Sequence, residues 1–213
     1  MKITSLAAHK GGVGKTMLTA SLAVLAQQDC EDEEGELGKG KVAMFDLDPQ
    51  GSLTAWYNAR QRDGPILVAP MLRTLALRLY ALNRKGVRYV FIDTPPGHSE
   101  YIAKAMNVAH LVVVPVRPGE LDYKAVQRTM QTVLFWEEPY LALPNGGLFR
   151  SRAMGELVRR LDADGQDRLP PVHHRVDLPL RSGLTLTETQ PNSAGAQELR
   201  NVWAKIRERL GER

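Results

Sequence analysis

The chain is poor in the features of secreted and membrane-spanning proteins. It holds a single cysteine, Cys30, in 213 residues, so no disulfide can form within it and a reducing compartment is expected. It has no apolar run long enough to cross a membrane, and residues 1–12 lack the apolar region and cleavage site of a signal peptide. A lone thiol also argues against an iron–sulfur cluster, which needs several thiolates. We therefore expect a cytoplasmic protein without a transmembrane helix.

Internal repeats, linkers and low-complexity segments are absent as well. Apolar residues make up 43% of the chain and charged residues 24%, which is typical of a globular protein. The length fits one α/β domain, and we expect residues 1–213 to form a single domain. The formal net charge of +4 permits a polyanionic partner without demonstrating one.

Short apolar segments alternate with segments of helical periodicity along the chain. Strands are expected at residues 3–8, 42–45, 66–69, 89–92, 111–116 and 140–143, with a further short strand within 170–179. Helices are expected at residues 16–28, 72–83, 121–136, 151–162 and 194–210. The acidic stretch 29–40 is expected to be a solvated loop. The alternation predicts an α/β fold with one doubly wound, mostly parallel sheet covered by helices on both faces.

Residues 9–16 (HKGGVGKT) follow the first expected strand and indicate a phosphate-binding loop. The pattern Gly-x-x-x-x-Gly-Lys-Ser/Thr is matched at its end by Gly14, Lys15 and Thr16, whereas His9 stands where the first glycine belongs. Lys15 is expected to reach the β- and γ-phosphates, and the Thr16 hydroxyl is expected to bind Mg²⁺. Backbone N–H groups of the loop and the following helix N-terminus would hold the phosphates. The predicted nucleotide-binding residues here are Gly11, Gly12, Val13, Gly14, Lys15, Thr16 and Met17.

Aspartates follow two of the expected strands. Asp46 and Asp48 lie in DLDPQGS after the strand at 42–45, and Asp93 lies in IDTPPG after the strand at 89–92. In an open parallel sheet, ligands bind beyond the carboxyl ends of the strands, where acidic residues can orient water or support a metal ion. An apolar strand that ends in aspartate is typical of the acidic Mg²⁺-supporting strand of P-loop proteins, which is the role expected of Asp93.

Four motifs, KGGVGKT, DLDPQGS, IDTPPG and VPVRP, occur in this order, and together they resemble the ParA/MinD family of ATPases with a deviant Walker A loop. The resemblance extends over most of the chain. Within the family, the chain is most similar to small ParA-type partition ATPases that lack an N-terminal DNA-reading extension. It implies ATP and Mg²⁺ as cofactors. It also implies that Lys10 crosses a dimer interface to the partner's nucleotide, that Asp48 serves hydrolysis and that Asp46 lies near the Mg²⁺ ion. Lys10, Lys15 and Asp48 are thus the predicted catalytic residues, and Thr16, Asp46 and Asp93 the predicted metal-site residues.

Two further parts of the chain are assigned by this resemblance. Pro115, Pro118 and Asn145 match the region that meets the adenine in the family, although LALPNGG departs from the commoner sequence around Asn145. Met17 stands where the family usually has threonine, which affects a contact to the nucleotide but leaves the Thr16 ligand in place.

The resemblance predicts an ATPase that positions or partitions a plasmid, a chromosome region or another cargo. ATP would join two copies into a homodimer, the dimer would bind DNA without sequence preference, and a ParB-like partner would stimulate hydrolysis, which implies association with the nucleoid. The DNA contacts would come from basic residues late in the chain. The candidates are Arg150, Arg152, Arg159, Arg160, Arg175, Arg181, Arg200, Lys205 and Arg207.

Two alternatives remain open at this point. A MinD-like protein would share the ATPase cycle but would use an amphipathic segment at 201–213 as a reversible membrane anchor. We favour core packing for the apolar residues of this segment, because amphipathic helices usually face a core and the charges here are mixed. A metabolic enzyme with the same loop is disfavoured by DLDPQGS and by the lack of an obvious second substrate site. The five histidines show no metal-ligand spacing and are interpreted as structural or surface residues.

Overall fold

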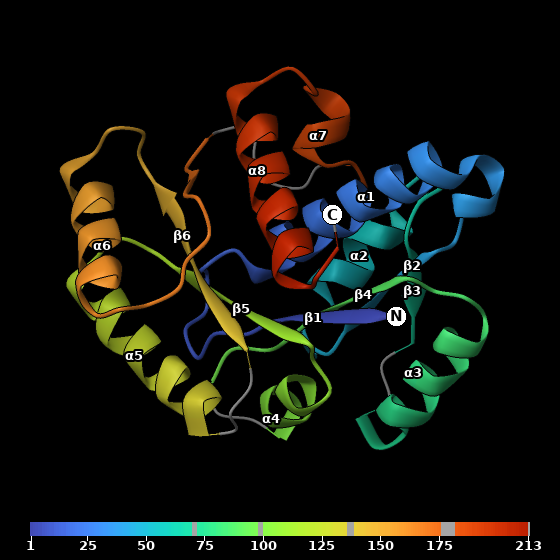
Figure 1. The fold of residues 1–213 in the computed structure, drawn as a ribbon, viewed down its shortest axis with the longest axis horizontal. Helices are drawn as coiled ribbons and strands as arrows, with labels where there is room; N and C mark the ends of the chain where they lie inside the picture. The colour runs from blue at the N-terminus through green and yellow to red at the C-terminus, as the bar shows by residue number, and fades with distance from the viewer. Residues whose placement is uncertain (70–71, 98–99, 136–138, 176–181, 213) are drawn as a thin grey trace.

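A parallel β-sheet forms the centre of the molecule in the computed structural model, which describes residues 1–69, 72–97, 100–135, 139–175 and 182–212 (Figure 1). Within these residues the sheet has seven strands in the order β3-β2-β4-β1-β5-β6-β7, and every pair of neighbours is parallel. The strands are β1 (Lys2–Leu6), β2 (Val42–Asp46), β3 (Ile66–Val68), β4 (Tyr89–Asp93), β5 (Leu111–Val116), β6 (Tyr140–Gly147) and β7 (Val172–His173). The predicted α/β fold with a parallel sheet is confirmed.

Helices cover both faces of the sheet (Figure 1). One face is covered by α1 (Lys15–Glu34), α2 (Ser52–Asn58), α7 (Leu186–Thr189) and α8 (Ala194–Arg209). The other face is covered by α3 (Leu75–Arg84), α4 (Glu100–Asn107), α5 (Glu120–Phe135) and α6 (Arg152–Ala163). Two 3₁₀ turns, η1 (Gly35–Gly38) and η2 (Leu72–Thr74), follow α1 and precede α3. No helix in the described ranges is long and apolar enough to cross a membrane.

The apolar pattern of the strands explains why both faces are covered. Successive side chains of a strand point to opposite faces of the sheet. In β4, Phe91 packs in the core beneath α1 and α8, whereas Val90 and Ile92 pack in the core beneath α3. All three side chains are buried, as are the other residues of this central strand. A strand that is buried at every position, as β4 is, is therefore stable only where helices cover both sides of the sheet.

The acidic stretch 29–40 differs from its prediction. It is not a solvated loop up to Gly40, because α1 continues through Glu34 and η1 follows. Asp29 accepts hydrogen bonds from Trp203 Nε1 at 2.6 Å and from Arg207 at 2.9 Å. Arg88 bonds to the carboxylates of Glu33 and Glu34 at 2.7 and 2.9 Å. Basic side chains from distant parts of the chain thus neutralise the acidic turn and hold it against α8 and β4.

Several other helix and strand boundaries differ between the prediction and the structure. The structure starts α3 at residue 75 rather than 72, extends β6 to 147 and ends β1 at 6. Residue 136 of the expected helix 121–136 and residues 176–179 of the expected segment 170–179 lie outside the described residues. Helices α2, α4 and α7 were not predicted, because seven, eight and four residues carry too little periodicity to reveal a helix.

Helix α8 belongs to the core. Val202 and Ile206 are fully buried and Trp203 is 3% exposed. The Trp203 ring lies 5.1 Å from Tyr89 and 5.8 Å from Phe91, measured between ring centroids. Core packing, which we favoured over a membrane anchor for the apolar residues of this segment, is what the structure shows.

Candidate nucleotide-binding site

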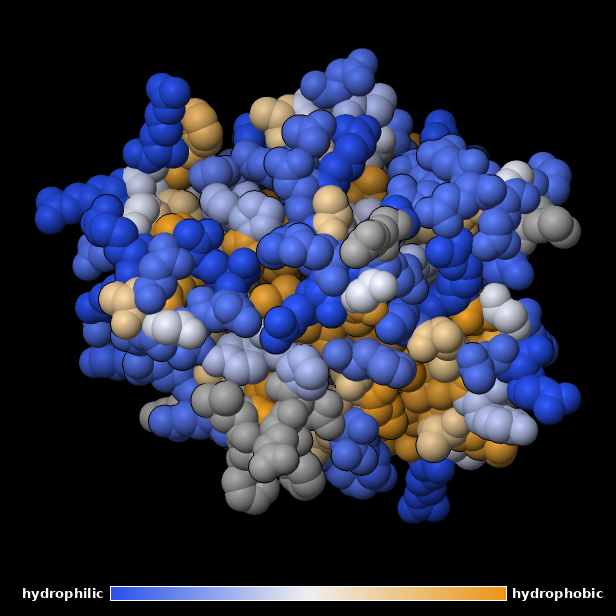
Figure 2. Space-filling view, viewed as in Figure 1, coloured by the Kyte–Doolittle hydropathy of each residue, from blue (hydrophilic) through white to orange (hydrophobic). Residues whose placement is uncertain are grey.

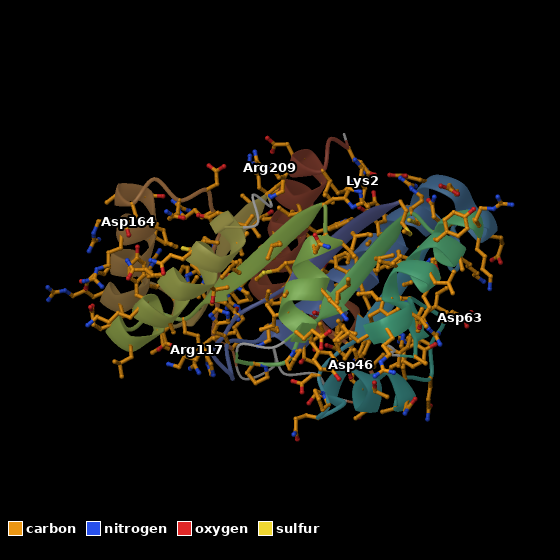
Figure 3. The ribbon with its side chains drawn as sticks, turned by 90° about the horizontal axis from the view of Figure 1, so that it is seen from below. Lys2, Asp46, Asp63, Arg117, Asp164 and Arg209 are labelled. Carbon is orange, nitrogen blue, oxygen red and sulfur yellow. The ribbon has the colours of Figure 1, made fainter. Side chains whose placement is uncertain are left out.

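The glycine-rich loop connects β1 to α1 at the carboxyl edge of the sheet. Gly12 and Gly14 have positive φ angles of 72° and 92°, which residues other than glycine rarely adopt. A Cβ atom on Gly14 would lie 2.5 Å from Nδ2 of Asn145, so this part of the loop also needs glycine for its close contact with β6. Figure 3 shows Asp46 and Arg117 along this edge of the sheet, with Lys2 and Arg209 at the opposite edge.

Lys15 is held inside the loop rather than extended into solvent. The residue is 7% exposed, and its Nζ atom lies 3.4 Å from the carbonyl oxygens of Ala8 and Lys10. Burial lowers the pKa of Lys15, and the nearby carboxylates of Asp93 and Asp48 partly offset this effect. An ammonium group that is desolvated and close to backbone N–H groups is suited to binding a phosphate anion.

Thr16 and Asp93 form the second polar pair of the site. The Thr16 hydroxyl donates a hydrogen bond to Oδ2 of Asp93 at 2.6 Å. Asp93 is fully buried, and burial raises the pKa of this carboxyl to about 7. Its other oxygen, Oδ1, is buried and has no hydrogen-bond partner among the described residues. A buried carboxylate oxygen needs a cation or a donor.

These oxygens fit Mg²⁺. The ion prefers oxygen ligands, and in nucleotide sites it usually binds one or two protein groups together with phosphates and water. The described residues contain no cluster of three or more His, Cys, Asp or Glu that could hold a metal ion. Thr16 and Asp93 are therefore the residues that could support Mg²⁺.

Asp46 and Asp48 have different surroundings. Asp46 is buried and accepts hydrogen bonds from the backbone and the hydroxyl of Thr54, both at 2.8 Å, so it anchors the turn into α2. Asp48 accepts a hydrogen bond from the backbone N–H of Gln50 at 3.0 Å. Asp48 also lines a cavity of about 580 Å³ that it shares with Gly11 to Met17, Ser52 and Trp56. Of the two carboxylates, Asp48 is the one that faces the phosphate loop across open space.

A second cavity, of about 320 Å³, adjoins the loop on the β6 side. It shares Gly12, Val13, Gly14 and Met17 with the first cavity. Its other lining residues are Arg117, Asn145, Gly146, His174 and Arg175. The loop is therefore bordered by open space on the side of Asp48 and α2 and on the side of β6.

Asn145 holds the loop in place. Its Nδ2 atom donates a hydrogen bond to the carbonyl oxygen of Val13 at 2.7 Å, and its Oδ1 atom is buried without a partner among the described residues. Pro115 lies within β5 opposite Leu143, and Pro118 packs near Gly147. Neither proline lines the two cavities.

Sequence reasoning missed Arg117 and His174 as lining residues of the second cavity. Arg117 lies between Pro115 and Pro118 in VPVRP, so the motif was identified from the sequence but no role was predicted for the Arg117 side chain. His174 follows β7, a strand of two residues whose position depends on pairing with β6.

Lys10 lies at the rim of the loop. Its Nζ atom lies 2.5 Å from Oδ1 of Asp122 on α5, and the two side chains are 43% and 19% exposed. Within one chain, Lys10 is therefore paired with the Asp122 carboxylate of α5 and does not reach the position of Lys15.

Most candidate DNA-binding residues are already paired within the protein. Arg160 binds Glu120, Arg175 binds Glu198, Lys205 binds Glu208, Arg207 binds Asp29, and Arg200 donates to the carbonyl oxygen of Pro191. Arg181 lies outside the described residues. Arg150, Arg152 and Arg159 are exposed and form no ion pair with another described residue. Arg150 lies over the ring of Phe149, which is 61% exposed.

Comparison with known proteins agrees with this geometry. The model of the CobQ/CobB/MinD/ParA nucleotide binding domain matches residues 4–210. The chromosome-partitioning ATPase Soj of Thermus thermophilus is 27% identical, and the match covers 98% of this chain and 96% of Soj. Maintenance of carboxysome distribution protein A of Halothiobacillus neapolitanus is 26% identical over 58% of this chain, and the match spans only 54% of that relative.

Solved structures share the fold. The MinD cell division ATPase of Pyrococcus furiosus has a TM-score of 0.77 at 18% identity, and the match covers 97% of this chain and 98% of MinD. MinD of Aquifex aeolicus, solved in a complex with MinC, has a TM-score of 0.75 at 17% identity over 100% and 97% of the two chains. The matched domain and the Soj relative extend over nearly the whole chain. The chain therefore belongs to the CobQ/CobB/MinD/ParA family of nucleotide-binding domains, which includes the ParA and MinD ATPases.

Proposed function

We propose that this chain is a ParA-type ATPase whose residues 1–213 act as one domain, and that ATP-dependent dimerisation lets it position or partition a cargo. The observation that carries the proposal is the placement of two lysines in one loop. Lys15 is buried inside the loop, whereas Lys10 lies exposed at its rim. One lysine is thus positioned for the chain's own nucleotide and the other for the nucleotide of a second copy.

Each residue of the site has a role that follows from its contacts. Lys15 and the loop N–H groups bind the phosphates, while Asn145 fixes the loop through Val13. Thr16 and Asp93 would hold a Mg²⁺ ion, which would supply positive charge to stabilise the phosphoryl group during hydrolysis. Asp48 faces the loop across the larger cavity and is positioned to orient the attacking water. Met17 lines both cavities, where its apolar side chain would contact a bound nucleotide without donating a hydrogen bond.

The proposed dimer is tested by its dependence on the nucleotide. The molar mass would be measured by light scattering after gel filtration, with ATP and with ADP. The Asp48→Ala variant would be used to slow hydrolysis, with and without Lys10→Ala. We expect a dimer with ATP only, and we expect Lys10→Ala to abolish it. A monomer under all conditions, while ATP still binds, would rule out the two-lysine arrangement.

Non-specific DNA binding is the second part of the proposal. The support is a group of exposed side chains that precedes and begins α6. Arg150 and Arg152 form no ion pair with another described residue, and Arg150 lies over the exposed ring of Phe149. Arginines neutralise phosphates, and aromatic rings stack on bases or sugars. We expect the ATP-bound protein to bind arbitrary duplex DNA with an affinity that falls as salt rises. Changing Arg150 and Arg152 to Ala should weaken binding, whereas Lys205→Ala, which removes a lysine already paired with Glu208, should not. Equal affinity of both variants would contradict this assignment.

A ParB-like partner that stimulates hydrolysis, and an association with the nucleoid, complete the proposal. The support is the family membership, in which Soj is a chromosome-partitioning ATPase and MinD forms a complex with MinC. The membrane-cycling alternative receives no support from α8. Releasing it would expose Val202, Trp203 and Ile206, at about 1.5–3 kcal/mol for each large side chain.

A further inference from the structure

The outer face of α3 is apolar where a solvent-exposed helix is normally polar. Leu77 is 67% exposed and Tyr80 is 62% exposed, whereas Leu75, Leu79 and Leu82 on the inner side are buried in the core. Figure 2 shows hydrophobic side chains gathered over this part of the molecule. We name this surface the α3 face and define it by Arg73, Ala76, Leu77, Tyr80, Ala81 and Arg84.

Helical spacing places these residues in one stripe. Positions 77, 80 and 84 of α3 are three or four residues apart, so they lie above one another on one side of the helix, and Arg73 precedes them in η2. The centre of the stripe is Leu77 and Tyr80, and the small side chains of Ala76 and Ala81 flank it. Helix α4 beside it has the usual solvent face, with an ion pair of 2.6 Å between Glu100 and Lys104. An apolar centre with small flanking residues suits close packing against another helix.

The ends of the stripe are positively charged. Arg73 is exposed in η2, just before α3 begins, and Arg84 is exposed at the last residue of α3. Residues 64–92 contain five arginines and lysines and no aspartate or glutamate. The acid that acts on Arg73 from a neighbouring element is Glu100, and it is already paired with Lys104. Among the residues that the structure describes, neither Arg73 nor Arg84 forms an ion pair, so the α3 face carries positive charge at both ends of its apolar centre.

Charge complementarity selects one kind of occupant. A second copy packed antiparallel on the same face would place Arg73 of each chain near Arg84 of the other, which is repulsive. Leu77 and Tyr80 alone bury too little apolar surface for stable binding to a membrane. DNA binds through its phosphates and would leave Leu77 exposed. We propose that the α3 face binds an acidic amphipathic helix of a partner protein, with apolar residues three or four positions apart and carboxylates at both ends of them.

The surface is separate from the nucleotide site. Its inner leucines pack on the sheet face opposite α1, the helix that follows the phosphate loop. Binding at the α3 face can therefore bring a cargo or regulator to the protein without occupying the cavities. The inference does not rest on the proposed dimer. ATP binding and dimerisation can be measured on the same variants, so a failure of this inference can be distinguished from a failure of the proposed function.

The test uses a display library of random 18-residue peptides, selected on the full chain with ATP. Enriched peptides are then titrated against the wild type and against Leu77→Ser, Arg84→Glu and Leu121→Ser. Leu121 is the matched control, since it is 76% exposed on α5, away from the α3 face. We expect acidic amphipathic peptides, with affinity at least tenfold lower for Leu77→Ser and Arg84→Glu and unchanged for Leu121→Ser.

Several results would overturn the proposal. They are a failure to enrich peptides, enrichment of basic peptides, and equal affinity for Leu77→Ser and the wild type. Two alternative ligands are tested for direct binding as well, namely phosphatidylserine vesicles and a random 40-base-pair duplex. Loss of vesicle or duplex binding in Leu77→Ser, or loss of a concentration-dependent dimer in this variant without nucleotide, would assign the face to a membrane, to DNA or to a second copy instead.

Discussion

Breaking the ion pair between Lys10 and Asp122 is expected to strengthen ATP-dependent dimerisation. In one chain Lys10 Nζ lies 2.5 Å from Asp122 Oδ1, and in the proposed dimer this lysine must turn to the partner's nucleotide. The pair therefore has to open before Lys10 can act. The Asp122→Asn substitution keeps the shape of the side chain and removes the charge that holds the lysine.

The magnitude follows from the exposure of the pair. Exposed ion pairs contribute about 0.2–1 kcal/mol, and the 19% exposure of Asp122 places this one near the upper end. Two pairs open per dimer, so the restraint is at most about 2 kcal/mol, which corresponds to about a 30-fold change in the dimer dissociation constant. Salt screens such pairs, so the difference between Asp122→Asn and wild type should shrink as ionic strength rises.

The assay is sedimentation equilibrium with ATP on the Asp48→Ala background, for Asp122→Asn and wild type. Glu120→Gln serves as the control, because it removes an equal charge from α5 at a residue that pairs with Arg160 instead of Lys10. We expect tighter dimers for Asp122→Asn alone. An unchanged or weaker dimer, or equal effects of the two substitutions, would refute the idea that Asp122 restrains Lys10.

Three further predictions concern buried groups. Asp93→Asn should stabilise the nucleotide-free protein in urea unfolding at neutral pH, because an amide removes the cost of burying a carboxylate. The same variant should lose at least tenfold of the Mg²⁺-dependent gain in ATP affinity; retention of that gain would exclude Asp93 as a Mg²⁺-supporting residue. Asn145→Ala should lower the free energy of unfolding by about 1–3 kcal/mol, because it leaves the Val13 carbonyl without its buried donor, and it should weaken binding of a fluorescent ATP analogue. The exposed Asn201→Ala is the control and should change neither quantity. Burial raises the pKa of Cys30 to about 11, so the folded protein keeps this thiol protonated while the unfolded chain ionises from about pH 9. The contribution of Cys30 to stability is thus complete below pH 9 and is lost as the pH rises towards 11, so the stability difference between wild type and Cys30→Ala should shift in favour of the variant over this interval. Rapid reaction of native Cys30 with Ellman's reagent at pH 8 would contradict this picture of burial.

The parallel sheet and the phosphate loop could be predicted from sequence because they depend on short-range requirements. Gly12 and Gly14 are needed where the backbone takes positive φ, and these positions belong to a motif of eight residues. Up to its last residue, Asp93, strand β4 is a run of apolar and aromatic residues without polar alternation, which predicts helices on both faces of the sheet. The positions of Asp46, Asp48 and Asp93 at strand ends follow from the same local pattern.

Local patterns failed where distant side chains decide the outcome. The acidic stretch was predicted to be a loop from its own composition, but Asp29 is bound by Trp203 and Arg207, which lie more than 170 residues away in the chain. The list of candidate DNA contacts also changed for this reason. A basic residue such as Arg175 looks free in sequence, yet its partner Glu198 becomes a neighbour only when α8 packs beside β7.

The sequence alone determined the order of the strands and of the longer helices α1, α3, α5, α6 and α8, the phosphate loop and the acidic residues beside it, because each of these depends on residues that are close together in the chain. Only the tertiary structure decided that Lys10 is held by Asp122, that Asn145 fixes the loop and that the face of α3 bearing Leu77 is uncovered. Lys10 and Asp122 are 112 residues apart, and Asn145 and Val13 are 132 residues apart. Such contacts arise from the packing of helices on the sheet, which brings together side chains that no local pattern relates.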